Sequence, residues 1–276
     1  MGSATVSDHG RWWSSETVAV VTGGNKGIGL EVVRRLALEG LTVILTAGDS
    51  GRGLKSTQFL HAQGLHNVVF QKLDVRRLDI LVNNAAVFHN NCVFENAFET
   101  LKINYRGIVA VIEELLPLFR ASHVGARIVN MSSFKQLNEP SQFDEYFLIE
   151  LDRDFLEACR LGNGGPNRYS NTAYQFSKIL INAHSRFLAI RLADEPDDHK
   201  IYVHNAHPGF LRTDMHRKLF HKLDDEMYQK QVTSGTFARD GVIEAEEGAD
   251  TPVLLCLLSP DDCVPKFFAV LRCRVY

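Results

Sequence analysis

The sequence has little cysteine and no long apolar run. Its cysteines are odd in number and form no CxxC pair, which argues against a disulfide framework or a zinc site and predicts a reducing compartment. The apolar runs are far shorter than the roughly 20 residues that a bilayer span needs. Residues 1–16 lack the apolar core of a signal peptide. These absences predict a cytoplasmic protein with no membrane segment and no bound metal. The cysteines are Cys92, Cys159, Cys256, Cys263 and Cys273.

Neither sign of charge is in excess. Thirty Lys and Arg residues are balanced by 33 Asp and Glu residues, which gives a formal net charge of −3. Without a basic excess the chain has little to neutralise a phosphate backbone, so nucleic-acid binding is not expected. Hydrophobic residues make up 45% and charged residues 23%, which excludes a disordered, collagen-like or coiled-coil chain. A length of 276 residues fits one large domain or two small ones.

Short β-rich segments alternate with longer helical ones. Residues 17–22, for example, are almost continuously apolar and partly β-branched, as in a buried parallel strand. The alternation predicts an α/β fold with one Rossmann-like, doubly wound parallel sheet of about seven strands and helices on both faces. Strands are expected at 17–22, 42–47, 67–72, 79–83, 126–131, 201–206 and 266–270, and helices near 28–39, 51–63, 94–120 and 172–194.

The first predicted strand is joined to the first helix by a glycine-rich turn, Thr22-Gly23-Gly24-Asn25-Lys26-Gly27-Ile28-Gly29. Glycines let a backbone turn sharply and approach a pyrophosphate, and the N-terminus of the following helix offers free N–H groups. The alternative is a tight turn with no ligand. Lys26 is placed to meet a 2′-phosphate, or it is a solvated surface lysine. An acidic residue at the end of the second strand would bind the ribose 2′-hydroxyl and favour NAD, but the nearest one, Asp49, comes late.

Tyr174 and Lys178 are four residues apart in a predicted helix, so they share one face. An ammonium group beside a phenol is expected to lower the pKa of the phenol toward working pH. The tyrosine would then act as a general acid or base. The spacing alone is common, and an exposed stacking pair is the alternative.

Several motifs follow one another in a fixed order. They are TGGNKGIG, Asn83-Asn84-Ala85-Ala86, Asn104 in Ile-Asn-Tyr-Arg-Gly, Ser132-Ser133, YQFSK, and HPGFLRTD at 207–214. This order resembles the short-chain dehydrogenase/reductase family over about residues 15–270. Tyr174 follows Ser133 by 41 residues, a long gap that resembles the carbonyl reductase branch with its plant salutaridine, menthone and neomenthol reductase-like members.

The resemblance implies a role for each matching residue. Tyr174 would donate a proton to a carbonyl, Lys178 would lower its pKa and hold the nicotinamide ribose, and Ser133 would bind the substrate oxygen. Asn104 would anchor a water in a proton relay, and Ser132 would be structural. The implied cofactor is NADPH, held by Gly23, Asn25, Lys26, Gly27, Ile28, Gly29, Asp74, Val75, Asn84, Tyr174, Lys178, Pro208, Gly209 and Thr213.

A purely structural role is the alternative at some of these positions. Asn104 could close a helix turn, Ser133 could be a turn residue, and Asp74 could cap the next segment. The resemblance also predicts the domain organisation. Residues 1–14 would be an N-terminal extension, and 15–276 would be a single NADP-binding reductase domain. Residues 134–173 would be an inserted helical segment next to the active site. Its amphipathic stretch is expected to cover the helices that pair between subunits in most of the family, so a monomer is expected.

The sequence departs from the family in two places. Gly48 stands at the end of the second strand, where the plant-like reductases usually have an arginine. The third strand is expected to end at Val75 and the fourth to begin at Asp79. Three residues between them reach at most about 10 Å. The strands would be about three spacings apart, or ~14 Å, and the chain would also have to return ~15 Å.

Parallel strands need a crossover of about a dozen residues. The crossover helix is therefore predicted to be missing, with strand three pulled out as a connector or strand four shortened or shifted. Asp74 would then lose its place beside the adenine, part of the sheet would lose its helical cover, and stability and NADPH affinity would be low.

Two functions compete. The first is NADPH-dependent reduction of a ketone or aldehyde carbonyl on a small apolar substrate, or the reverse oxidation of an alcohol. The second is a catalytically weak or inactive homologue that at most binds nucleotide or a partner. A Rossmann-like methyltransferase is a poor alternative because it would leave Tyr174, Lys178 and Asn104 without a role.

Overall fold

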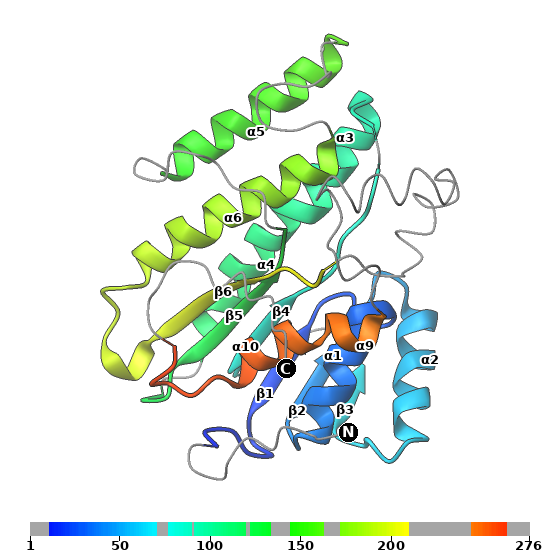
Figure 1. The fold of residues 1–276 in the computed structure, drawn as a ribbon, viewed down its shortest axis with the longest axis vertical. Coiled ribbons are helices and arrows are strands. Elements are labelled where there is room, and N and C mark those ends of the chain that lie inside the picture. The colour runs from blue at the N-terminus through cyan, green and yellow to red at the C-terminus, as the bar shows by residue number, and fades with distance from the viewer. Residues whose placement is uncertain are drawn as a thin grey trace, which may run out of the picture.

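The computed structural model describes residues 11–70, 77–89, 91–119, 122–133, 144–162, 172–209 and 244–263. They form one parallel sheet of six strands in the order β3-β2-β1-β4-β5-β6 (Figure 1). The expected fold class is therefore confirmed, and the seventh strand, expected at 266–270, lies outside the described residues. The strands are β1 (Val18–Val21), β2 (Thr42–Leu45), β3 (Val68–Phe70), β4 (Ile80–Asn83), β5 (Ala126–Met131) and β6 (Ile201–Ala206).

Helices follow the strands as the alternation predicts. The helical region expected at 94–120 is divided into α3, a π-helical turn, α4 and a 3₁₀ turn. No helix among the described residues is long and apolar enough to cross a membrane. The α-helices are α1 (Gly27–Leu38), α2 (Ser50–His61), α3 (Phe94–Leu101), α4 (Gly107–Leu115), α5 (Glu145–Arg160), α6 (Ala173–Arg191), α9 (Ala245–Gly248) and α10 (Asp250–Leu257).

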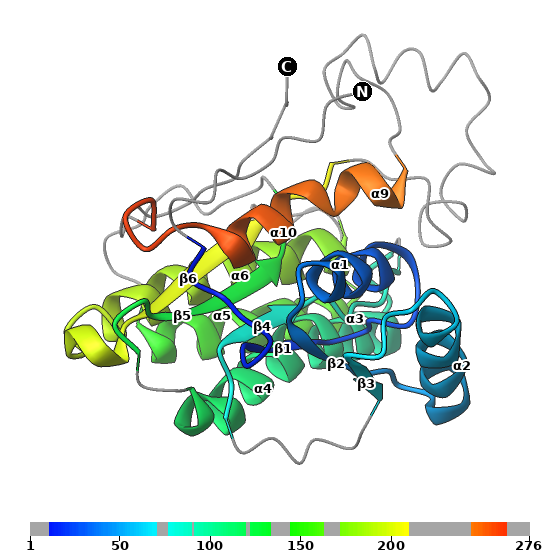
Figure 2. The ribbon, with the colours of Figure 1, turned by 90° about the horizontal axis from the view of Figure 1, so that it is seen from below.

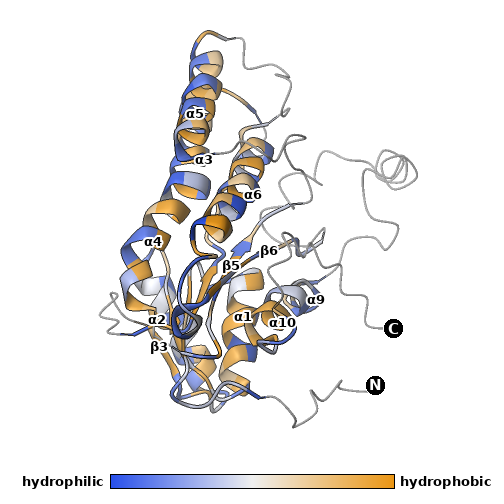
Figure 3. Cartoon of the chain, turned by 90° about the vertical axis from the view of Figure 1, so that its left-hand side faces the viewer, coloured by the Kyte–Doolittle hydropathy of each residue, from blue (hydrophilic) through white to orange (hydrophobic). Residues whose placement is uncertain are grey.

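Successive side chains of each strand point to opposite faces, so the sheet has two apolar cores. Ala19 and Val21 of β1 pack with α1 and α10 on one face, whereas Val20 packs with α3, α4, α5 and α6 on the other. Figure 2 shows α1, α9 and α10 above the sheet and α4 below it. In Figure 3 the sheet lies between α4 on one side and α1 and α10 on the other. Burial of both faces explains why the strands are almost continuously apolar.

The segment expected as a helical insertion contains α5. This helix begins where the Asp144 carboxylate accepts a hydrogen bond from the Phe147 backbone N–H at 2.7 Å, an N-terminal cap. Its buried side, which includes Leu148 and Phe155, packs against α3 and α6 (Figure 1). The rings of Phe155 and Phe176 are stacked with centroids 4.0 Å apart. The amphipathic stretch therefore covers α3 and α6 within the same chain.

The connection between β3 and β4 is short, but β3 ends at Phe70 and not at the expected Val75, so it has nine residues rather than three. β1 and β2 lie between these two strands in the sheet, yet only the nine residues 71–79 connect Phe70 to Ile80. Nine residues are fewer than the dozen that a parallel crossover requires, so a crossover helix is missing. Residues 71–76, which include Asp74 and Val75, lie outside the described residues.

The apolar cover of β2 and β3 differs between the two faces. Val43, Leu45 and Val68 are buried against the α1 side of the sheet. Ile44 and Val69, which alternate with them, are only partly buried within the described structure. Complete burial of a Val or Ile side chain stabilises a fold by about 1.5–3 kcal/mol. The incomplete cover of these two side chains agrees with the loss of a helix from this face.

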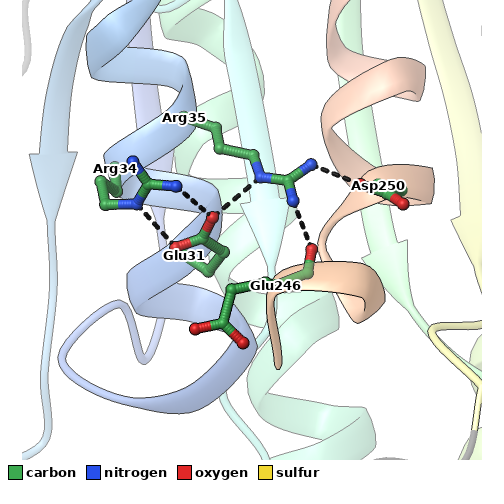
Figure 4. A network of polar contacts seen from close by, with 5 residues as sticks. All are labelled: Glu31, Arg34, Arg35, Glu246 and Asp250. Atoms are coloured by element: carbon green, nitrogen blue, oxygen red, sulfur yellow. Dashed lines mark hydrogen bonds and ion pairs between the residues drawn. The ribbon is translucent and has the colours of Figure 1, made fainter. Parts of the chain in front are cut away.

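A charged network joins α1 to α9 and α10, which are far from it in the sequence (Figure 4). Glu31 accepts hydrogen bonds from Arg34 at 2.6 and 2.7 Å and from Arg35 at 2.9 Å. The Arg35 guanidinium also donates to the Asp250 carboxylate and to the Glu246 carbonyl, both at 2.5 Å. Glu31 is buried, so the two arginines compensate for the loss of its hydration.

Replacement of Glu31 by Gln is expected to lower the free energy of unfolding at pH 7 by about 1–3 kcal/mol, because two guanidinium groups lose a charged partner. Burial acts to raise the pKa of Glu31, but Arg34 and Arg35 outweigh it and hold the pKa below 4.5. A lowered folded-state pKa stabilises the fold above the unfolded-state value, and this contribution disappears as the pH falls through the folded-state value.

Urea unfolding at several pH values measures this effect. The difference between parent and Glu31→Gln should be complete at pH 7 and should shrink as the pH falls below 4.5. Glu114→Gln on the exposed side of α4 is the matched control and should change stability by less than about 0.5 kcal/mol. Equal stability of parent and Glu31→Gln at pH 7 would contradict the argument.

Candidate active site

The carboxyl ends of β1 and β4 are joined by a compact set of hydrogen bonds around Thr22. The Thr22 hydroxyl accepts from the backbone N–H groups of Asn84 and Ala85, both at 3.0 Å. The Asn84 side-chain amide donates to the carbonyls of Thr22 and Gly23 at 3.0 and 3.1 Å. Asn84 therefore holds the glycine-rich turn beside the loop that follows β4. This is the edge of a doubly wound sheet where ligands bind, between strands whose connections run in opposite directions.

The glycine-rich turn has the backbone shape that a pyrophosphate needs. Gly23 adopts a φ of +62°, a region that favours glycine. A Cβ on Gly29 would lie 2.3 Å from the Asn84 amide nitrogen and 2.5 Å from the Gly23 carbonyl oxygen, so only glycine fits there. Lys26 precedes α1 without capping it through its side chain, and the first turn of α1 has no acidic residue. The residues present therefore fit a dinucleotide phosphate at the start of α1.

The adenine side of the crevice has fewer suitable groups. Asp49 caps α2 by accepting a hydrogen bond from the Arg52 N–H at 2.8 Å, and the Ser56 hydroxyl donates to the Asn25 carbonyl at 2.8 Å. The Ser56 contact holds α2 against the glycine-rich turn. A Cβ built on Gly48 meets nothing within 4 Å, and Lys26 is exposed. There is room for a cation at Gly48, but the sequence has none at this position.

Helix α6 places Tyr174 and Lys178 beside each other. Thr172 caps this helix, its hydroxyl accepting from the Gln175 N–H at 3.2 Å, so Tyr174 lies in the first turn. The Lys178 ammonium is 5.5 Å from the centroid of the Tyr174 ring and donates to the Met131 carbonyl at 2.7 Å. Phe88, from the loop after β4, packs edge-on against Tyr174 with ring centroids 5.0 Å apart.

The two side chains have strongly shifted pKa values, and the expected direction for the tyrosine is wrong. Burial raises the pKa of Tyr174 to about 12, whereas the spacing predicted a lowered value. Burial also lowers the pKa of Lys178 to about 8. Desolvation disfavours the charged form of each group, which is the phenolate of Tyr174 and the ammonium of Lys178. Near neutral pH Tyr174 therefore carries its proton, the form that a proton donor requires.

The two adjacent serines after β5 differ in their surroundings. The Ser132 hydroxyl is buried, 2.7 Å from the Asn182 amide oxygen and 3.2 Å from the Lys178 carbonyl. The Ser133 carbonyl accepts from the Asn182 amide at 2.8 Å, and the side chain of Ser133 is partly exposed. Among the described residues, the Ser133 hydroxyl has no protein partner. These contacts agree with a structural Ser132 and leave Ser133 available to a substrate.

Asn104 lies in the π-helical turn Lys102–Arg106, between α3 and α4. Its fully buried amide makes two hydrogen bonds with the backbone of Val87, at 2.8 and 2.9 Å, and donates to the Ser177 hydroxyl at 3.2 Å. It thus links the loop after β4 to the helix that carries Tyr174. Turns of π type inside helices are frequent at functional sites.

The structure brings most of the expected residues to one edge of the sheet. The turn from Gly23 to Gly29, Asn84, Asn104, Ser133, Tyr174 and Lys178 follow the carboxyl ends of β1, β4 and β5 or lie on adjoining helices. Pro208 and Gly209 follow β6, and Gly209 has a φ of +84°. Asp74, Val75 and Thr213 lie outside the described residues.

The sequence motifs do not predict a buried polar network of Asn83, Asn130, Ser185 and Asn205 that lies beneath this edge. The Asn130 amide donates to the Ser185 hydroxyl at 2.9 Å, and its oxygen accepts from Asn83 at 2.8 Å. The Ser185 hydroxyl also lies 2.7 Å from the Asn205 amide oxygen. Polar residues inside apolar strands and on the buried face of α6 were the available signal.

Comparison with known proteins gives two kinds of likeness. A sequence profile described as short chain dehydrogenase matches residues 17–78 and 69–146. Mouse carbonyl reductase [NADPH] 1 is 32% identical over 283 residues, covering 90% of this chain and 93% of the relative. Salutaridine reductase from Papaver bracteatum is 30% identical over 292 residues, covering 81% and 91%.

This chain belongs to the short-chain dehydrogenase/reductase family.

Solved structures agree with this membership. Salutaridine reductase from Papaver somniferum superposes with a TM-score of 0.70 at 28% identity, covering 89% of this chain and 97% of the other. Menthone neomenthol reductase from Mentha piperita gives a TM-score of 0.64 at 24% identity, covering 90% and 96%, a likeness of fold. The expected resemblance to the carbonyl reductase branch of the family, with its salutaridine and menthone reductase-like members, is confirmed.

The comparisons also mark the short connection. The family profile matches this chain in two pieces rather than one, residues 17–78 and 69–146, which meet at residues 69–78. The alignment with mouse carbonyl reductase has 283 positions, although it covers only 90% of these 276 residues. The relative therefore has residues without a counterpart here. In this short-chain dehydrogenase/reductase the two pieces of the profile match meet at the connection between β3 and β4.

Proposed function

We propose that this oxidoreductase is an NADPH-dependent carbonyl reductase of the cytoplasm that reduces the ketone or aldehyde of a small apolar molecule. The observation that carries the proposal is the meeting of Ser133, Tyr174 and Lys178 at the carboxyl end of β5, beside a turn that fits a pyrophosphate. The names of the relatives support the same chemistry, since they include carbonyl reductase [NADPH] 1 and salutaridine reductase.

Each side chain has a distinct task in the proposed reaction. Bound NADPH supplies a hydride to the carbonyl carbon. The Ser133 hydroxyl donates a hydrogen bond to the carbonyl oxygen, and the Tyr174 phenol transfers its proton to that oxygen as negative charge develops. The Lys178 ammonium stabilises the resulting phenolate. Below pH 8 Lys178 is mostly protonated, so its charge is present when it is needed.

A second candidate is a weak or inactive homologue that at most binds nucleotide or a partner. The short connection between β3 and β4 favours it, because Asp74, the predicted adenine contact, lies within the connecting residues 71–79. Fluorescence titration with NADPH, followed by NADPH consumption with a panel of ketones and aldehydes, separates the two. Binding without consumption indicates the inactive homologue, and consumption indicates the reductase.

Tyr174→Phe tests the assignment of the proton donor. The phenyl ring keeps the packing against Phe88 but has no proton to transfer. We expect kcat to fall by at least about a hundredfold, while the Kd for NADPH stays within about twofold. Tyr146→Phe on the exposed side of α5 is the control and should leave both constants unchanged. If the Tyr174→Phe enzyme keeps an activity within a few-fold of the parent, Tyr174 is not the proton donor.

Gly48→Arg tests which part of the crevice faces the 2′-phosphate. The open space around Gly48 accepts a long side chain, and a charged hydrogen bond there should raise the preference for NADPH over NADH about tenfold. Gly48→Gln has no charge and is the matched control. The ratio of the two Kd values measures the effect, and an equal gain for both dinucleotides would place Gly48 away from the phosphate. Lys26→Ala should reduce the parent's preference.

We expect the protein to be a monomer. Helix α5 packs over α3 and α6, so those helices are already covered by a segment of the same chain. Light scattering at micromolar concentration should give the mass of one chain, 31.0 kDa. A mass twice as large would show that another surface pairs, or that α5 leaves enough of α3 and α6 exposed.

A further inference from the structure

We propose that Asn182 is a positioning residue for carbonyl reduction, which fixes the backbone of Ser133 so that its hydroxyl is held at the same site as the Tyr174 phenol. The inference rests on the proposed function. Asn182 touches neither substrate nor dinucleotide in this reaction. It acts through Ser133.

One face of α6 carries Tyr174, Lys178 and Asn182. Asn182 follows Lys178 by four residues and Tyr174 by eight, so the three side chains lie along one side of the helix. Lys178 donates through its ammonium to the Met131 carbonyl at 2.7 Å, and its own carbonyl lies 3.2 Å from the Ser132 hydroxyl.

Asn182 continues this line of contacts. Its amide oxygen accepts from the Ser132 hydroxyl at 2.7 Å, and its NH₂ group donates to the Ser133 carbonyl at 2.8 Å. Three consecutive residues at the end of β5 are therefore held against α6. Their position relative to Tyr174 is set by Lys178 and Asn182 together.

Ser133 lies just beyond the support of the sheet. β5 ends at Met131, and the Ser132 N–H makes its sheet bond to the Ala206 carbonyl at 2.8 Å. One residue further, the Ser133 carbonyl is bound by Asn182. A side chain on a strand end without such support is free to shift, and misplacement by about 1 Å can cost a hundredfold in rate.

The contacts explain the need for an amide at this position. Asn182 is 2% exposed, and it both accepts and donates toward the two serines. An aspartate could accept from Ser132 but could not donate to Ser133 when ionised. Alanine would remove the donor to the Ser133 carbonyl and leave the Ser132 hydroxyl with only its longer contact to the Lys178 carbonyl.

The same helix offers a matched control. Ser185 is also buried and also joins α6 to the sheet, through Asn130 at 2.9 Å and Asn205 at 2.7 Å. In β5 the partner of Ser185 is Asn130, which lies two residues before Ser132. The bonds of Ser185 therefore do not involve Ser133. Ser185→Ala therefore removes a comparable polar contact without releasing the catalytic serine.

A double-mutant cycle between Asn182→Ala and Ser133→Ala tests the inference with the full chain, NADPH and a ketone that the parent reduces. Asn182→Ala is expected to lower kcat about tenfold to a hundredfold, with the Kd for NADPH within about twofold. In the Ser133→Ala background the same substitution should change kcat less than about twofold, because its effect passes through the serine hydroxyl. Ser185→Ala should leave kcat within about twofold.

The outcomes are distinct. Multiplicative effects of the two substitutions, or an unchanged kcat in Asn182→Ala, would overturn the inference while leaving the reductase intact. If Asn182→Ala does not fold, Asn182→Ser keeps a partner for the Ser132 hydroxyl and goes through the same cycle. A parent that binds NADPH and reduces no carbonyl would overturn the proposed function first, and the positioning role with it.

Discussion

The parallel pairing of β1 with β4 is the interaction on which the candidate site depends. It aligns Val21 with Val82, so the two chains leave the sheet together and Thr22 can hold the loop of Asn84. The Asp79 carboxylate, which accepts from the Val18 N–H at 2.8 Å, anchors the other end of the same pair. β2 and β3 then lie on one side of this pair and β5 and β6 on the other, which opens a crevice above it. The phosphate side and the catalytic side of the site are the two walls of this crevice.

The catalytic wall is held mainly by polar contacts, in contrast to the two apolar cores on either side of the sheet. Between α6 and the strands, amides and hydroxyls are paired at the depth where Leu and Val would otherwise pack. Buried polar groups contribute only about 1 kcal/mol each when satisfied, but they require one specific geometry. Apolar packing alone would allow α6 to slide by fractions of an ångström. The Asn182 amide fixes the register of α6 beside Ser132 and Ser133, and with it the distance from Tyr174 to the end of β5.

Much of the fold was readable from the sequence because its signals are local. Continuous apolar, β-branched runs located the described strands to within one or two residues, except that β3 ends at Phe70 and not at Val75. Short contiguous motifs located Tyr174, Lys178 and Asn104. The buried network of Asn130, Ser185 and Asn205 was missed because its members come from three separate elements and form no motif. The raised pKa of Tyr174 was also missed, since it depends on how much protein surrounds the ring. The missing crossover was found by counting residues, because the span of a chain follows directly from its length.

The short connection between β3 and β4 changes how this sheet can assemble. Partners across the β1–β4 pair, such as Val18 and Asp79, are only 61 residues apart in the sequence. Contacts between nearer residues form faster, since less loop entropy is lost before they are made, although the gain grows only with the logarithm of loop length. The connecting residues 71–79 are too few for a crossover helix, and Ile44 of β2 and Val69 of β3 are only partly buried. We therefore expect the β2–β3 edge of the sheet to open locally more readily than its centre, where β1 and β4 pair.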